Sequence, residues 1–179
     1  MRRVFSGVNL QSDDFELFGL ARRFAQDRAA LDARWKDLQR QAHPDKFTAQ
    51  GAAAQRIAMQ WSVRINEAYQ RLKNPLKRAA YLCELHGAPI NAENNTAMPA
   101  SFLMQQMQWR EELDEAQGAQ DLEQISQQCR QAERDVLLKI EHLLDQSHDY
   151  NGAVAQVRAL MFIERFAADV NDRLDRIET

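Results

Sequence analysis

Apolar residues recur at helical spacing along most of this chain, and few helix-breaking residues interrupt them. Residues spaced i, i+4, i+7 and i+11 lie on one face of an α-helix, and one such set falls within residues 27–42. Its members are Leu31, Trp35, Leu38 and Ala42. The 179 residues include only four prolines and six glycines, whereas the good helix formers Ala, Leu, Gln, Arg and Glu are abundant. We therefore expect an all-α protein that forms one domain of ordinary size or two small ones.

Capping residues and prolines predict where the helices begin and end. Asp27 can cap one helix, which must end before His43 because a residue that precedes a proline is disfavoured in helical conformation. Asn74 can cap another helix, with Pro75 in its first turn. We expect helices at about residues 13–20, 27–42, 52–73, 75–86, 99–117, 121–146 and 152–177. The stripes expected to face the core are Ile57, Trp61, Ile65, Ala68 and Leu72; Leu122, Ile125, Cys129, Val136, Ile140 and Leu143; and Leu160, Ile163, Ala167, Val170 and Leu174.

A segment without apolar periodicity separates the first four expected helices from the last three. Residues 87–101 read GAPINAENNTAMPAS, which is a linker composition. We expect a domain at residues 1–87, a linker at 88–98 and an antiparallel three-helix bundle at 99–179. Residues 1–87 hold 15 Lys and Arg against 9 Asp and Glu, a net charge of +6, and the remainder hold 8 against 17, or −9, which sum to −3. This asymmetry predicts different partners for the two parts.

Composition also bears on the compartment. No apolar run approaches membrane-spanning length, and the first ten residues lack the pattern of a secretory signal. Cys83 and Cys129 are far apart in the sequence and lie among apolar residues, so we expect two buried free thiols and no disulfide or metal pair. These features predict a reducing, cytoplasmic location.

The tripeptide His43, Pro44 and Asp45 is the most distinctive short motif. On residue types alone it could hold a proton-transfer pair, half of a metal site, or a shape that another protein reads. No phosphate-binding glycine loop, nucleophile elbow or zinc-spaced ligand pair accompanies it, so we expect no catalytic residue and no metal ligand. Pro44 fixes the turn, and Asp45 offers a carboxylate that an arginine can bind with two hydrogen bonds, which favours docking. An ordinary loop is the alternative.

The helix before this motif is basic on its outer face. Lys36 and Arg40 lie at about 140° and 180° from Leu31, opposite the buried stripe. Such a face suits an acidic partner, although an ordinary solvated helix would look similar. A nucleic-acid-binding module is less favoured, because Asp32 and Asp37 interrupt the basic residues and no strongly basic stripe is present.

The helix expected from Pro99 has apolar residues on two sides. Phe102, Trp109, Leu113 and Ala116 share one face, which predicts contact with the core. The opposite side carries Leu103, Met104, Met107, Glu111 and Glu115, and Phe162 of the last helix is a candidate to complete this second patch. Flexible methionines rimmed by carboxylates suit protein binding, unless the helix is simply central and covered on both sides.

The order of these elements resembles that of a J domain: a short helix, a basic helix, an HPD loop and a long helix. J proteins bind DnaK-type ATPase chaperones through the basic helix and the HPD loop, and they stimulate ATP hydrolysis by the chaperone. The resemblance implies an N-terminal J domain that performs no chemistry itself. Its implied chaperone contacts are His43, Pro44, Asp45, Lys36 and Arg40.

Four longer segments resemble the HscB family, the J-type co-chaperones of iron–sulfur cluster assembly. They read LFGL, LQRQAHPDKF, INEAYQRLKNPLKRAAYLCELHG and SFLMQQMQWREELDE. In that family the J domain recruits the chaperone HscA, and the C-terminal three-helix domain holds the cluster scaffold IscU. The resemblance therefore implies these two kinds of partner, with no cofactor, nucleic acid or membrane, and leaves self-association open. The implied scaffold contacts are Leu103, Met104, Met107, Glu111, Glu115 and Phe162.

The chain departs from the family pattern at a few places. Ala42 stands where an aromatic residue is common, and Gln108 stands where an acidic residue is common, which puts one scaffold contact in doubt. The zinc-binding cysteine extension of some eukaryotic relatives is absent, which favours a bacterial cytoplasmic protein. A generic J protein with another client is the alternative, and the segment FLMQQMQWREELDE argues against it.

Overall fold

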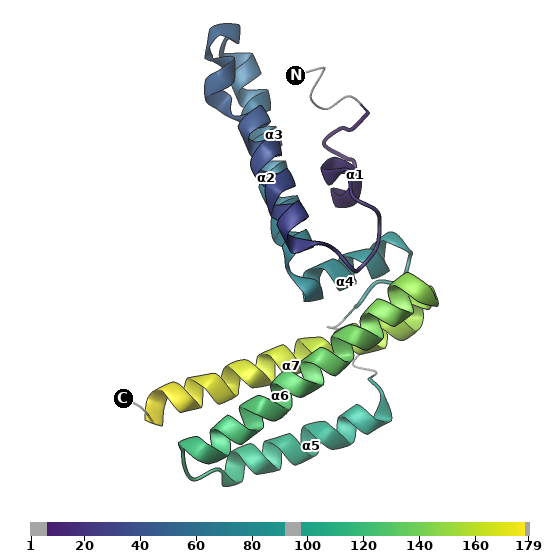
Figure 1. The fold of residues 1–179 in the computed structure, drawn as a ribbon, viewed down its shortest axis with the longest axis vertical. Coiled ribbons are helices and arrows are strands. Elements are labelled where there is room, and N and C mark those ends of the chain that lie inside the picture. Colours follow the sequence, from purple (N-terminus) through teal and green to yellow (C-terminus); the bar gives the residue numbers. More distant parts are fainter. Residues whose placement is uncertain (1–6, 92–97, 178–179) are drawn as a thin grey trace. The chain divides into compact units, whose positions relative to one another are not determined.

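The computed structural model describes residues 7–91 and 98–177, in which every regular element is a helix (Figure 1). The elements are α1 (Asp14–Phe18), α2 (Arg28–Ala42), the 3₁₀-helix η1 (Pro44–Gln50), α3 (Ala52–Lys73), α4 (Pro75–Leu85), α5 (Ala100–Glu115), α6 (Ala119–Glu141), the π-helix η2 (His142–Gln146) and α7 (Tyr150–Ile177). The all-α fold class is confirmed. Within the described ranges, no helix is both long and apolar enough to cross a membrane.

The chain divides into two compact units, Met1–Arg78 and Ala79–Thr179, so the division falls within α4. The sequence predicts a linker at residues 88–98, of which 92–97 lie outside the described residues. The described beginning of that segment packs within the second unit: Ala88 and Ile90 are buried, and the Arg158 guanidinium donates to the Ile90 carbonyl at 2.9 and 2.6 Å. Loop composition indicates where a helix is absent, but it does not indicate whether the loop packs.

In the first unit, α2 and α3 form a helical hairpin whose core lies between them (Figure 1). Leu31 and Leu38 of α2 and Ile65 of α3 are almost fully buried. At the edge of this core, the Trp35 ring stacks on Tyr69 with centroids 4.6 Å apart. The predicted bounds of α2 and α3 are confirmed. Asp27 caps the start of α2, and His43, which is in extended conformation before Pro44, ends this helix.

Three core predictions are wrong by one residue: Ile57, Leu143 and Ala167, whose neighbours Ala58, Leu144 and Phe166 are the buried ones. Ile57 is 46% exposed and its neighbour Ala58 is fully buried, because the buried stripe of α3 is centred nearer to Ala58 at the start of the helix. In η2, which directly follows α6, Leu144 is buried whereas Leu143 is half-buried. The π-helix η2 widens the last turn and shifts the register of the residues that follow Glu141.

A buried carboxylate attaches α1 to α3. Asp14 is fully buried, with Oδ1 at 2.7 Å from Nη2 of Arg64 and Oδ2 at 3.0 Å from Nη1 of Arg71. Removing one partner of a buried ion pair leaves the other charges without compensation, which is strongly destabilising.

We therefore expect Asp14→Ala to lower the free energy of unfolding by about 3–5 kcal/mol. Glu67→Ala, which removes an exposed carboxylate from α3, should change it by less than about 0.5 kcal/mol. Urea denaturation of both variants measures the difference, and equal stabilities would show that the Asp14 ion pairs do not hold α1 in place.

In the second unit, α5, α6 and α7 form a three-helix bundle (Figure 1), as predicted. Its core lies mainly between α6 and α7 and includes Leu122, Ile140 and Leu160. Cys83 and Cys129 are buried free thiols in this unit, as predicted, and burial raises the pKa of each to about 11. Both are therefore protonated and unreactive near neutral pH.

The helix α5 is held to the bundle by few side chains. Trp109 is the buried residue of this helix; its ring stacks on Phe166 at 5.5 Å and its Nε1–H donates to the Gln128 side chain at 2.9 Å. At the end of α5, the Arg173 guanidinium donates to the carbonyls of Leu113 and Ala116. These contacts fix one face of α5 and leave the opposite face uncovered within its own unit.

Candidate interaction surfaces

The HPD loop is a short, internally braced turn at the end of α2. Pro44 begins η1, and the backbone N–H of Asp45 donates to Nδ1 of His43 at 3.3 Å. The Thr48 hydroxyl donates to the Asp45 carbonyl at 3.0 Å, and Phe47 is buried beneath the turn. These local hydrogen bonds and the buried Phe47 hold the backbone of the turn. The Asp45 carboxylate and Nε2 of His43 are therefore not needed to stabilise it.

Both polar side chains of the loop face solvent. The side chain of Asp45 is 85% exposed and that of His43 is 58% exposed, with 3.5 Å between Oδ2 and Nδ1. Because Nδ1 of His43 accepts the backbone hydrogen bond, the neutral ring carries its proton on Nε2. The described residues contain no group of three or more His, Cys, Asp or Glu that could hold a metal ion. This geometry suits recognition by another molecule better than catalysis.

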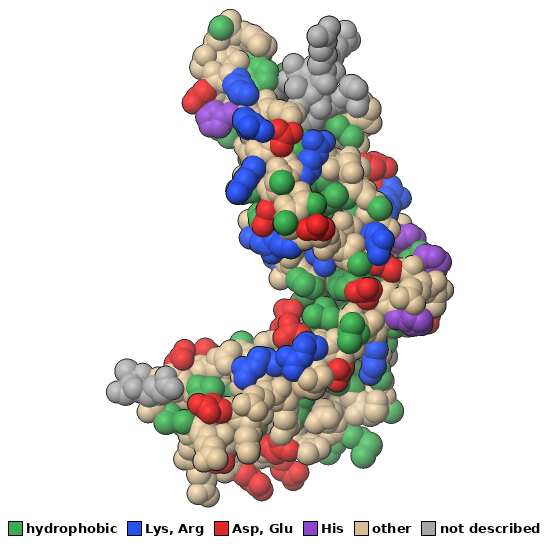
Figure 2. Space-filling view, in the orientation of Figure 1, with side chains coloured by type: hydrophobic (Ala, Val, Ile, Leu, Met, Phe, Trp, Pro, Cys, Tyr) green, Lys and Arg blue, Asp and Glu red, His purple; other side chains and the backbone are tan. Residues whose placement is uncertain are grey.

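The outer face of α2 is basic but partly compensated. Lys36 and Arg40 are exposed, and Nη2 of Arg40 lies 2.6 Å from Asp37. The Asp32 carboxylate accepts a hydrogen bond from the Tyr69 hydroxyl at 2.8 Å, and this bond, together with Arg28 and Lys36 nearby, lowers the pKa of its carboxyl. An exposed pair such as Arg40 and Asp37 is weak, so Arg40 can exchange this carboxylate for one on a partner. Figure 2 shows Lys and Arg side chains beside the histidine of this unit.

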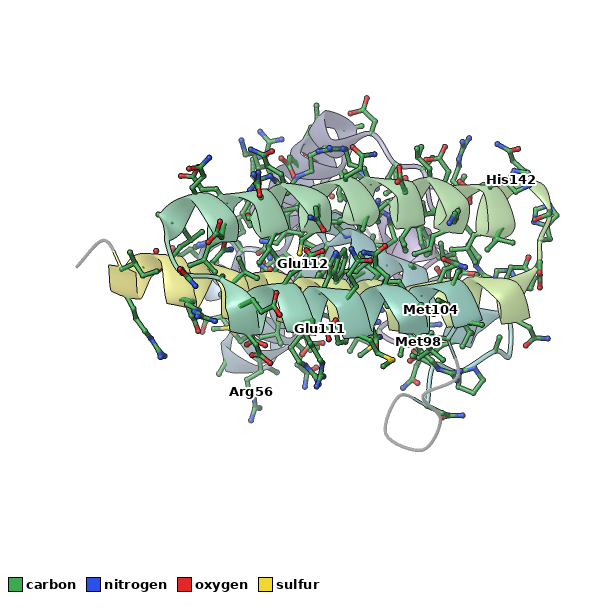
Figure 3. All side chains as sticks on the ribbon, turned by 90° about the horizontal axis from the view of Figure 1, so that it is seen from below. Arg56, Met98, Met104, Glu111, Glu112 and His142 are labelled. Carbon is green, nitrogen blue, oxygen red and sulfur yellow. The ribbon has the colours of Figure 1, made fainter. Side chains whose placement is uncertain are left out.

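The second surface is the outward side of α5, which we call the α5 patch: Leu103, Met104, Met107, Glu111 and Glu115. Its three apolar side chains are 45%, 75% and 74% exposed, respectively, and both glutamates are exposed. Figure 3 shows Met104 and Glu111 on the side of α5 away from α6, whereas Glu112 points toward α6. The structure thus brings these five predicted residues together on one face.

Phe162 does not belong to this exposed group. It is half-buried between α5 and α7, with its ring 5.8 Å from Phe102 and 5.9 Å from Phe166. The Arg110 guanidinium lies 5.8 Å from the ring centroid on a further side. Phe162 is thus less exposed than a member of the second patch was expected to be, because α5 covers the side of α7 on which it lies. It borders the α5 patch, and its contact with the scaffold stays a prediction.

Sequence reasoning also missed residues that depend on the contact between α5 and α7. Arg173 fixes the end of α5 through backbone carbonyls, and no spacing rule connects it with a helix about 60 positions earlier. Gln108, one of the departures from the family pattern, is exposed and donates to Glu112 at 2.8 Å. It lies four residues after Met104 and three before Glu111, so it borders the α5 patch.

A helical hairpin with an exposed HPD loop, joined to a helical bundle with an exposed apolar helix face, defines a J-type co-chaperone. Residues 98–171 match the family model described as the HSCB C-terminal oligomerisation domain. Over 174 residues the chain is 48% identical to the "Co-chaperone protein HscB homolog" of Burkholderia mallei, covering 96% of this chain and 99% of that protein. The homologue of Burkholderia multivorans is 49% identical over 175 residues, with the same coverage.

Solved structures agree with these relatives. The chaperone HscB from Vibrio cholerae matches with a TM-score of 0.78 and 33% identity, over 93% of this chain and 99% of that one. The human co-chaperone HscB matches with a TM-score of 0.85 and 26% identity, over 96% and 86%. The chain belongs to the HscB family, which confirms the resemblance drawn from its sequence, and its role is that of a co-chaperone in iron–sulfur cluster assembly.

Proposed function

We propose that this protein binds an IscU-type scaffold through the α5 patch and delivers it to HscA, a DnaK-type chaperone whose ATPase it stimulates through the HPD loop. The observation that carries the proposal is the uncovered face of α5, where three large apolar side chains are exposed although Trp109 anchors the opposite face. A separate surface, the exposed polar HPD loop, lies in the other unit, which allows one chain to engage two partners.

The chaperone contact is electrostatic in character. The exposed Asp45 carboxylate can accept two hydrogen bonds from an arginine of the chaperone, and Lys36 and Arg40 can meet carboxylates. No step of this role requires the chain itself to make or break a covalent bond. We therefore propose that the chain is not an enzyme and that catalysis takes place in HscA.

The scaffold contact is mainly apolar. Unbranched methionine side chains adapt to irregular surfaces, and apolar side chains at the centre of an interface often contribute more than about 1–2 kcal/mol each to binding. Glu111 and Glu115 add negative charge at the rim, which favours a basic edge on the scaffold. A generic J protein with another client would share the HPD loop but would not need this patch.

Because the proposed HscA contact and the proposed scaffold contact lie in different units, a substitution in one surface should affect one partner only. Replacing Lys36 and Arg40 by alanine should weaken stimulation of HscA, mainly by slowing association, because long-range attraction is lost. The wild-type contact should weaken as salt rises. Scaffold affinity should be unchanged, since both residues lie in the first unit. Stopped-flow association and steady-state ATPase rates measure the effect, and a parallel loss of scaffold binding would contradict two separate surfaces.

Steady-state ATPase activity of HscA tests the proposal directly. The scaffold and this protein are added separately and then together. We expect the protein alone to stimulate the rate and the combination to exceed the sum of the separate effects. If the scaffold adds nothing but the protein alone stimulates, the chain is a J protein with another client.

A further inference from the structure

A groove lies between α5 and α7, next to the α5 patch. Its volume is about 300 Å³. Its lining is Arg110, Leu113, Asp114, Phe162, Arg165, Phe166 and Asp169. The floor is apolar and includes the buried ring of Phe166, whereas the walls carry four exposed charged side chains, two from each helix.

These four charges do not neutralise one another. In the part of the chain that the structure describes, the side chains of Arg110, Asp114, Arg165 and Asp169 form no ion pair or hydrogen bond, and the Arg110 guanidinium lies over the face of the Phe162 ring. Each arginine precedes its aspartate by four residues, and a basic residue before an acidic one is the less favourable order for such a pair on a helix. Their hydrogen-bonding groups are therefore available to a partner.

The charges are also ordered along the groove. Phe102 contacts Phe162, Trp109 contacts Phe166, and the end of α5 contacts Arg173, so α5 and α7 run in the same direction. Arg110 and Arg165 therefore lie at about the same height along the two helix axes, beside Phe162 and the α5 patch. The two aspartates lie one helical turn further along, about 5–6 Å away. The positively charged part of the groove, formed by the two arginines, thus adjoins the α5 patch. The negatively charged part, formed by the two aspartates, lies further along the groove.

We infer that the scaffold-binding surface continues from the α5 patch into this groove, where Arg110 and Arg165 together bind a carboxylate side chain of the scaffold. The inference rests on the proposed function, because the occupant is the same IscU-type partner. If the apolar residues of the scaffold contact the α5 patch, an acidic side chain next to them on the scaffold can reach Arg110 and Arg165. Asp114 and Asp169 repel any acidic side chain of the scaffold at the other end of the groove, and this repulsion sets the direction in which the scaffold segment lies.

Titration calorimetry with the IscU-type scaffold tests the inference. Arg110→Gln and Arg165→Gln should each weaken binding about five- to twentyfold at low salt, as expected for a charge-assisted contact at a partly exposed site. Both variants should also show a smaller dependence of affinity on salt. The matched control is Arg134→Gln, which removes an exposed arginine of α6 outside the groove and should bind within about twofold of wild type. None of the three side chains is buried, so all three variants should fold.

A charge exchange identifies the occupant. Arg110→Glu should bind poorly, and one Asp→Lys or Glu→Lys substitution on the scaffold surface should recover binding to this variant while weakening binding to Arg134→Gln, which keeps Arg110. If no such substitution recovers binding, the groove takes no scaffold carboxylate and the inference is overturned.

The α5 patch supplies the comparison that separates this inference from the proposed function. If the patch variant Leu103→Ala, Met104→Ala, Met107→Ala loses binding while both arginine variants match Arg134→Gln, the groove inference alone is wrong. If the wild-type protein does not bind the scaffold, both are wrong.

Discussion

Replacing Leu103, Met104 and Met107 together by alanine should weaken scaffold binding by well over tenfold while leaving the fold nearly intact. All three side chains are largely exposed, and exposed truncations usually change stability by less than about 0.5 kcal/mol each. At the centre of an interface, however, the same side chains exclude water and dominate the binding energy. Titration calorimetry and thermal denaturation of the triple variant measure the two effects separately.

Trp109→Ala is the control on the opposite face of α5. Trp109 is 1% exposed and stacks on Phe166, so its loss should lower the free energy of unfolding by about 3–5 kcal/mol. Binding should then decrease only as far as folding does. An early-melting triple variant beside a stable Trp109→Ala variant would mean that the two faces of α5 have been exchanged. Phe162 is left out of the triple variant, because its half-buried ring would mix the two effects.

Asp45→Asn should abolish stimulation of the HscA ATPase without unfolding the protein. The carboxylate is 85% exposed, and the braces of the loop use the backbone atoms of Asp45, which the substitution retains. An amide cannot accept the paired hydrogen bonds of an arginine as a carboxylate does. Glu67→Gln, which neutralises an exposed carboxylate of α3, is the matched control and should stimulate normally. Full stimulation by folded Asp45→Asn would refute docking through this carboxylate.

The parts of the fold that were predicted from sequence depend on local chemistry. Asp27 and Pro44 determine where α2 begins and ends, and helical spacing alone places Leu103, Met104 and Met107 on the side of α5 away from Trp109. That this side is uncovered is seen only in the structure. The errors arise where a distant element decides the outcome. Helical spacing favours Phe162 as a member of the second patch, whereas in the structure α5 half-buries its ring, and the position of α5 over α7 cannot be read from either helix. Helical spacing predicts Leu143 in the core, but a π-turn, which leaves no clear signal in the sequence, puts Leu144 there instead.

The candidate site divides in the same way. The HPD loop and the α5 patch are each formed by one short segment, so their residues could be named in advance. The groove beside the patch was not foreseen, because it brings Arg110 together with Arg165, and these residues become neighbours only when α5 packs on α7. The HscA and scaffold contacts remain predictions, whereas membership of the HscB family is shown.

The central claim is that one chain carries both contacts and thereby joins the scaffold to the chaperone. Its most direct test is the steady-state ATPase rate of HscA with scaffold and a mixture of two variants: Asp45→Asn, which should retain only scaffold binding, and the α5-patch triple variant, which should retain only the HPD loop. We predict that the mixture stimulates the ATPase far less than the wild-type protein does. In this comparison each variant is present at the concentration used for the wild-type protein. A mixture as active as the wild type would show that the two surfaces need not lie on one chain, and would contradict the account.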